Sequence, residues 1–124
     1  MHPELPPVVL ITLDTTRRDA LGAYGAPGGT TPALDRLADV ATVYDNAWST
    51  SPWTLPSHAS LFTGLYPSHH GAGVSDDRLR REQLTLAEVL AEKGYFTVGV
   101  AGGHLASSHF GLAQGFLRYR DPEG

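Results

Sequence analysis

A predicted helix that leads directly into an apolar strand constrains this fold more than any other feature of the sequence. Thr85-Leu-Ala-Glu88 has the pattern of a capping box, apolar residues follow at helical spacing, and Gly94 supplies a stop. Residues 95–101, Tyr-Phe-Thr-Val-Gly-Val-Ala, are then typical of a strand. A helix, a short turn and a strand form the second half of a β-α-β unit. The sequence therefore predicts an α/β fold with at least two parallel strands.

The other predicted elements fit a mostly parallel sheet that is flanked by helices. Residues 8–13, Val-Val-Leu-Ile-Thr-Leu, form a nearly continuous apolar run, which is typical of a strand buried on both faces. Residues 31–39 predict a helix with Thr31 as its N-cap and Pro32 at its first position. A weaker strand candidate follows at residues 41–48.

Composition and local patterns exclude several classes of protein. The chain has 124 residues, of which 41% are hydrophobic and 18% charged, as expected for one soluble domain. Its net charge of -4 argues against binding to nucleic acid. Because it has no cysteine, disulfides, zinc ribbons and cysteine nucleophiles are excluded. The glycine-rich turn at residues 22–29 has neither a dinucleotide fingerprint nor a Walker loop, so a flavodoxin-like or nucleotide-binding domain ranks last.

The amino-terminal residues 1–7 contain no basic stretch and no long apolar segment. We therefore predict neither a signal peptide nor a membrane segment, and we expect a cytoplasmic protein.

Asp14 follows the first predicted strand, at the edge of the sheet where open α/β proteins bind ligands. A carboxylate there can hold a divalent cation. The alternative is that Asp14 caps the turn or short helix that begins with Thr15 and Thr16. Position alone leaves both interpretations open.

Residues 51–64 bring a hydroxyl group to the start of a predicted helix. Pro56 suits the first helical position and Gly64 ends the helix, which places Thr54 just ahead of it. A helix N-terminus presents N–H groups and a partial positive charge, so it would hold a tetrahedral anion beside the Thr54 hydroxyl. That hydroxyl needs activation by a base or by a metal, which Asp14 could hold. The alternative is that Thr54 and Ser57 are only helix caps.

Several segments, in the right order, resemble the amino-terminal part of a sulfatase of the alkaline phosphatase superfamily. They are residues 10–19, 54–64, 65–71, 84–98 and 110–116. The resemblance covers essentially the whole chain, residues 1–124. It implies the amino-terminal portion of a catalytic domain, a metal-dependent hydrolase that acts on small sulfate or phosphate esters.

Thr54 falls at the first position of the sulfatase signature Cys/Ser-x-Pro-Ser-Arg, and Pro56 and Ser57 match its third and fourth positions. In that family the Cys or Ser is oxidised to formylglycine, whereas a threonine would give a ketone, so no formylglycine is expected. Other branches of the superfamily, such as nucleotide phosphodiesterases and phosphoethanolamine transferases, use an unmodified, metal-bound threonine. The resemblance thus implies that Thr54 is the nucleophile and a metal ligand, and that Asp14 is a metal ligand.

The chain also departs from the sulfatase pattern. His58 replaces the arginine of the signature, and it either hydrogen-bonds the transferred group in a catalytic role or faces solvent. Asp14 is followed by Thr15, so the second early aspartate of many sulfatases is absent. A phosphonate- or diester-cleaving relative is therefore the closer analogue.

Other residues near these motifs are weaker candidates. Arg18, with Ser57, is assigned to substrate binding, and Asp19 could orient the loop. For both Arg18 and Asp19, a position on the surface or behind the residues that contact the ligand is the favoured interpretation. Of His69 and His70 at most one reaches the site, because adjacent residues face different ways. Two further histidines, His104 and His109, could rim the pocket, although ordinary loop positions are the favoured interpretation.

By resemblance, the remaining metal ligands, an aspartate with a histidine or asparagine, come from a much later segment. The expected metal, which is calcium, manganese, magnesium or zinc, would thus find only half of its ligands here, and we expect little or no turnover by the chain alone. The open edge of a truncated sheet would need cover from the missing C-terminal part or from self-association. The competing hypothesis is a non-catalytic α/β interaction module or a pseudo-enzyme fragment.

Overall fold

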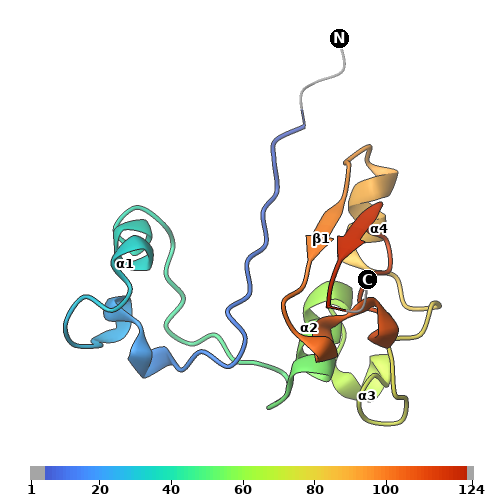
Figure 1. Cartoon of the computed structure of the whole chain (residues 1–124), viewed down its shortest axis with the longest axis horizontal. Helices are drawn as coiled ribbons and strands as arrows, with labels where there is room; N and C mark the ends of the chain where they lie inside the picture. Colours follow the sequence, from blue (N-terminus) through green and yellow to red (C-terminus); the bar gives the residue numbers. More distant parts are fainter. Residues whose placement is uncertain (1–4, 123–124) are drawn as a thin grey trace. The chain divides into compact units, whose positions relative to one another are not determined.

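The computed structural model describes residues 5–122 and divides them into two compact units (Figure 1). The N-terminal unit consists of residues 6–48, and the C-terminal unit consists of residues 49–122 together with Leu5. Each unit is described by itself below. Within residues 5–122, no helix has the length and apolar character that crossing a membrane requires.

The N-terminal unit is built from short helices. It holds two 3-10 helices, Arg18–Ala20 and Gly22–Tyr24, and the α-helix α1, Pro32–Ala38. Thr31 is the N-cap of α1 and Pro32 its first residue, as the sequence predicts. The Thr31 hydroxyl accepts a hydrogen bond from the Gly22 N–H at 2.8 Å and donates to Asp35 Oδ1 at 2.9 Å. These bonds join the start of α1 to the second 3-10 helix.

Both strands predicted in the N-terminal unit are wrong. Residues 8–13 and 41–48 contain no strand, and the apolar side chains of the first run are exposed, with 78% of Val9 and 76% of Ile11 accessible. A strand requires a neighbouring backbone to pair its N–H and C=O groups. Among residues 6–48 no strand forms that could supply that neighbour.

The helices of the C-terminal unit are α2 (Thr54–Thr63), α3 (Pro67–His70) and α4 (Leu86–Glu92). The predicted capping box is confirmed at α4, where Thr85 Oγ1 accepts from the Glu88 N–H at 3.3 Å and Glu88 Oε2 accepts from the Thr85 N–H at 2.8 Å. Gly94 follows this helix with a φ of 91°, a conformation that favours glycine.

A two-stranded parallel sheet lies in the same unit, where Figure 1 shows β1 (Val98–Val100) beside β2 (Arg118–Arg120). Val98 is opposite Arg118 and Val100 is opposite Arg120. Between the strands run two 3-10 helices, His104–Ala106 and Ser108–Phe110. The parallel α/β architecture and the strand at residues 95–101 are thus confirmed, and this strand pairs with residues 118–120.

The core of the C-terminal unit joins helices to loops. Its buried apolar side chains are Leu55, Ala59, Ala72, Leu79 and Leu112, and Phe62, Ala106 and Phe110 pack against them. Leu55 and Ala59 lie four residues apart on α2, so one face of this helix is held against the core. This packing fixes the position of the first turn of α2.

Candidate functional site

The candidate nucleophile Thr54 is the first residue of α2. Trp53 is the N-cap, with extended backbone angles of -140° and 163°, and the first helical hydrogen bond runs from the Ser57 N–H to the Trp53 carbonyl at 3.3 Å. The expectation that Thr54 lies just ahead of the helix is therefore wrong, because the helix begins two residues earlier than predicted, at Thr54 and not at Pro56. Pro56 sits third and not first, which is tolerated because N–H groups of the first turn have no partner within the helix. Thr54 is half-buried and lies at the end of α2 that carries the positive helix dipole.

Ser57 anchors the loop before α2. Its Oγ lies 2.9 Å from Ser49 Oγ, and Ser49 Oγ donates its single proton to the Ser51 carbonyl at 2.7 Å. The proton between the two serines must therefore come from Ser57. The Ser57 hydroxyl keeps only acceptor capacity beyond this bond.

The His58 side chain forms a hydrogen bond within its own helix, α2. Its Nδ1 lies 2.9 Å from the Thr54 carbonyl, which can only accept, so Nδ1 carries a proton and donates it. The ring also meets Phe62 edge-on, at 6.5 Å between centroids, and the residue is buried. The sequence leaves two interpretations of His58 open. The one in which it faces solvent is wrong, because the side chain is buried. Any contact with a transferred group must use Nε2.

A hollow of about 310 Å³ lies beside the first turn of α2. The indole of Trp53 covers Gly73, where an added Cβ would stand 2.6 Å from the ring. Two carboxylates, Asp76 and Asp77, give this hollow a negative charge, although Asp76 is paired with Arg80 at 2.7 Å. Hydrogen bonds from Arg80 hold the pKa of Asp76 below its usual value. The remaining lining residues are Leu55, Val74, Ser75 and Phe110.

Asp14 lies in a tight turn of the N-terminal unit. The Thr16 N–H donates to the Leu13 carbonyl at 3.3 Å, which places Asp14 and Thr15 at the centre of the turn. Thr15 has a φ of 58°, a costly conformation for a β-branched residue. No helix begins at Thr15 or Thr16, since the next 3-10 helix starts at Arg18. Of the alternative that Asp14 caps a turn or a short helix, the helix is therefore wrong, and the turn stays open.

Arg18 is engaged inside the N-terminal unit. Its guanidinium donates to the Asp45 carbonyl at 2.8 Å and stacks 4.4 Å from the centre of the Tyr24 ring. Asp19 pairs with Arg17, whose hydrogen bonds lower the pKa of the Asp19 carboxyl. The structure thus places Asp14 and Arg18 in one unit, whereas the candidates on α2 lie in the other.

The donors of the described residues do not by themselves fit a metal ion. Within residues 5–122, no three histidine, aspartate or glutamate side chains gather into a group that could hold one. Thr54 and Asp14 lie in different units, so neither unit contains both of the ligands that the resemblance implies.

His70 is the histidine that the fold buries, with 1% of its surface exposed. The Ala72 N–H donates to His70 Nδ1 at 3.1 Å, so in the neutral ring the proton is on Nε2, which faces Ser60 Oγ at 3.0 Å. Burial lowers the pKa of this imidazole, against an opposing effect of the Pro56 backbone. His70 is therefore a neutral, structural residue that links α2 to α3.

This buried imidazole predicts a pH-dependent stability. In the unfolded chain it takes up a proton near its usual pKa of 6.5, whereas the folded state resists protonation. The unfolded state then binds more protons, so the free energy of unfolding should be constant above that pH and fall below it. Urea denaturation between pH about 5 and about 8 measures the effect.

His69 is exposed and provides the control for this prediction. His69→Gln should keep the pH slope of the wild type, and His70→Gln should flatten it. NMR titration of the His70 ring gives an independent readout, in which this ring should take up its proton below its usual pKa of 6.5. A pKa of His70 at or above that value would contradict the assignment.

The two other histidines within residues 5–122, His104 and His109, stack together. The rings of His104 and His109 lie 6.4 Å apart, and both meet Phe110 edge-on at 5.1 Å and 5.0 Å. Their role at a pocket rim stays a prediction.

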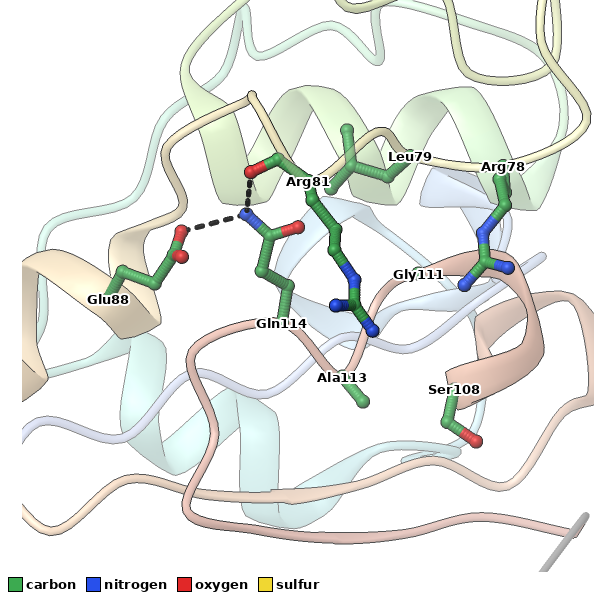
Figure 2. A pocket seen from close by; sticks show the side chains of 8 residues that line it. All are labelled: Arg78, Leu79, Arg81, Glu88, Ser108, Gly111, Ala113 and Gln114. Carbon is green, nitrogen blue, oxygen red and sulfur yellow. Dashed lines mark hydrogen bonds between the residues drawn. The ribbon is translucent and has the colours of Figure 1, made fainter.

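Sequence reasoning missed the buried pair of Ser60 with His70, and it missed a second pocket in which Gln114 is central (Figure 2). The Gln114 side chain bonds to residues 26 to 33 positions away. The one sequence signal for this pocket is the apolar pattern of residues 110–116 around Gln114, which indicates that the segment is ordered.

Comparisons with known proteins decide the family. The Sulfatase family model matches residues 6–121. The chain belongs to the sulfatase family. An ulvan-active sulfatase of Formosa agariphila is 41% identical over 104 residues, which cover 84% of this chain and 20% of that protein. Human arylsulfatase A is 39% identical over 125 residues, covering 92% of this chain and 24% of the relative.

A solved structure agrees with this assignment. A sulfatase structure from Bacteroides thetaiotaomicron matches 82% of this chain with a TM-score of 0.67 and 27% identity, covering 22% of that protein. This sulfatase chain thus spans about a quarter or less of the length of these relatives. The partial alkaline-phosphatase-like fold expected from the sequence is confirmed.

Proposed function

We propose that residues 1–124 form the N-terminal portion of a sulfatase-like catalytic domain that hydrolyses sulfate or phosphate esters, with Thr54 as the nucleophile. The observation that carries this proposal is the place of Thr54 at the first residue of α2, in a chain of the sulfatase family. A hydroxyl there lies where backbone N–H groups and the helix dipole favour an anion.

The proposed chemistry has two steps. The Thr54 oxygen attacks sulfur or phosphorus in line and the bond to the leaving oxygen breaks. The proton of the Thr54 hydroxyl passes to that oxygen, which departs as the alcohol, and N–H groups of the first turn of α2 stabilise the developing negative charge. Water then attacks the covalent intermediate, releases sulfate or phosphate, and restores the Thr54 hydroxyl. His58 Nε2 is assigned to hydrogen-bond the transferred group, and Arg18 is assigned to the substrate. Ser57 is assigned to the substrate as a hydrogen-bond acceptor, because its own proton is donated to Ser49. Because Thr54 cannot yield an aldehyde, this route uses no formylglycine.

Covalent labelling tests the proposal directly. The chain is incubated with nitrophenyl sulfate or nitrophenyl phosphate, and the added mass is located by peptide mapping. A sulfo or phosphoryl group on Thr54 is expected, and steady turnover is expected to be slight. Which of the two esters labels the chain would also decide between sulfate and phosphate.

A non-catalytic interaction module is the second candidate. It is favoured by the exposed apolar side chains of the small sheet, among them Val98 and Val100, which are typical of a surface that another protein part covers. In this case neither labelling nor metal binding would be expected.

Metal binding discriminates between the two functions. We propose Asp14 as a ligand of a divalent cation, so calorimetric titration with calcium, manganese, magnesium or zinc should show weak binding that is lost in Asp14→Asn. Asp39→Asn, an exposed carboxylate of the same unit, is the matched control and should bind as the wild type does. Identical titrations for Asp14→Asn and the wild type would remove Asp14 from the proposed site.

A further inference from the structure

A second cavity in the C-terminal unit, of about 460 Å³, takes no part in the proposed chemistry (Figure 2). It lies between the loop that precedes α4, the start of α4 itself, and the segment that follows β1. Its volume is within the range of about 300 to 1,000 Å³ typical of small-molecule pockets. Eight residues line it: Arg78, Leu79, Arg81, Glu88, Ser108, Gly111, Ala113 and Gln114.

The back of this cavity is fixed by the core. Leu79 is buried, and its N–H donates to the Phe110 carbonyl at 2.9 Å. Gly111 packs against the Leu79 backbone so closely that an added Cβ would stand 2.4 Å from its carbonyl oxygen. The loop that carries Arg78 and Arg81 is thus held at one point against the opposite wall.

The Gln114 amide holds the other end of the same loop. Its Nε2 lies 2.6 Å from the Gln83 carbonyl, 3.2 Å from the Arg81 carbonyl and 2.9 Å from Glu88 Oε2. The same carboxylate oxygen accepts from the Thr85 N–H at 2.8 Å. Burial alone would raise the pKa of Glu88, but hydrogen bonds from Gln114 and Thr85 lower it overall. Glu88 is therefore an anion whose Oε2 is occupied by the helix cap and Gln114.

Two positive charges of the cavity are left without a carboxylate partner. Of the arginines in this loop, Arg80 is paired with Asp76 at 2.7 Å. In the part of the chain that the structure describes, neither Arg78 nor Arg81 forms an ion pair. Figure 2 shows both guanidinium groups reaching into the hollow, with the Ser108 side chain on another wall. With Glu88, the lining carries a formal net positive charge.

We propose that this cavity binds an oxyanion group, a sulfate or a phosphate, that is carried on a small organic molecule. Guanidinium groups match the oxygen atoms of such anions with paired hydrogen bonds. The apolar side chains of Leu79 and Ala113, which line the cavity, suit the organic part of the ligand. Because no lining residue lies on α2, the proposal does not depend on the role of Thr54.

The test is an NMR titration of the full chain with ethyl sulfate and with ethyl phosphate, at constant ionic strength and with ethanol as the uncharged control. The side-chain N–H signals of Gln114 and Arg81 should shift and saturate with either anion but not with ethanol. The double variant Arg78→Gln/Arg81→Gln should bind at least about tenfold more weakly, which corresponds to about 1.4 kcal/mol. Whichever ester binds more tightly indicates which oxyanion the cavity prefers.

Two controls keep this proposal separate from the proposed catalysis. Arg120→Gln removes an exposed arginine of the same unit that does not line the cavity, and it should leave binding unchanged. Thr54→Ala should also bind as the wild type does. Equal affinity in the double variant, or loss of binding in Thr54→Ala alone, would overturn the assignment to this cavity. Both arginines are exposed, so their replacement should not disturb the core, and unchanged backbone spectra verify this.

Discussion

Replacing Thr54 with alanine should abolish transfer of a sulfo or phosphoryl group to this chain. The substitution removes the attacking oxygen at the first residue of α2 and leaves the core face of the helix in place. Loss of the nucleophile from an enzyme that forms a covalent intermediate lowers kcat by on the order of a millionfold. We therefore expect the rate of labelling by nitrophenyl esters to fall at least about a thousandfold.

Two further threonine variants distinguish the loss of the Thr54 hydroxyl from a disturbance of α2. Thr54→Ser keeps the oxygen and should retain labelling. Thr63→Ala changes the last residue of α2, whose hydroxyl donates to the Ala59 carbonyl at 2.7 Å, and labelling should not change. Undiminished labelling of Thr54→Ala would exclude Thr54 as the nucleophile. A wild-type chain that is not labelled, with each divalent metal supplied in turn, would favour the non-catalytic interaction module.

Elements whose signals are local could be predicted from the sequence. The cap at Thr85, the stop at Gly94 and the first turn of α1 at Pro32 each depend on residues within one helical turn, and the structure contains all three. The predicted strands at residues 8–13 and 41–48 fail for the opposite reason. A strand depends on a partner at any distance along the chain, and apolar composition alone does not supply it.

In the candidate site, too, features with local sequence signals could be predicted and contacts between distant residues could not. The α2 helix and the place of Thr54, Ser57 and His58 on one short segment follow from the sequence, apart from the two-residue error in where the helix begins. That error arises because proline is tolerated throughout a first turn, so Pro56 marks a helix start only approximately. The bond from Ser60 to His70 spans ten positions, and the bonds of Gln114 span more, so no local pattern predicts them.

The largest effect on stability is expected for Leu55→Ala. Leu55 is 1% exposed and belongs to a core cluster that, among residues 5–122, consists of five buried apolar side chains. Truncation of a buried leucine to alanine costs about 2 to 5 kcal/mol, because transfer energy is lost and a cavity remains. The total stability of a domain is only about 5 to 15 kcal/mol, so this single change should remove a large part of it.

Leu61→Ala is the matched control, because Leu61 lies on the same helix with 46% of its surface exposed. Its effect should be within about 0.5 kcal/mol of zero, as for most surface substitutions. Urea denaturation of the three proteins, followed by circular dichroism, measures both differences. The comparison also bears on Thr54, since the core contact of Leu55 holds the adjacent first turn of α2 in place. If Leu55→Ala were no less stable than Leu61→Ala, Leu55 would not be the core contact that positions this turn, and the site built on it would have to be abandoned.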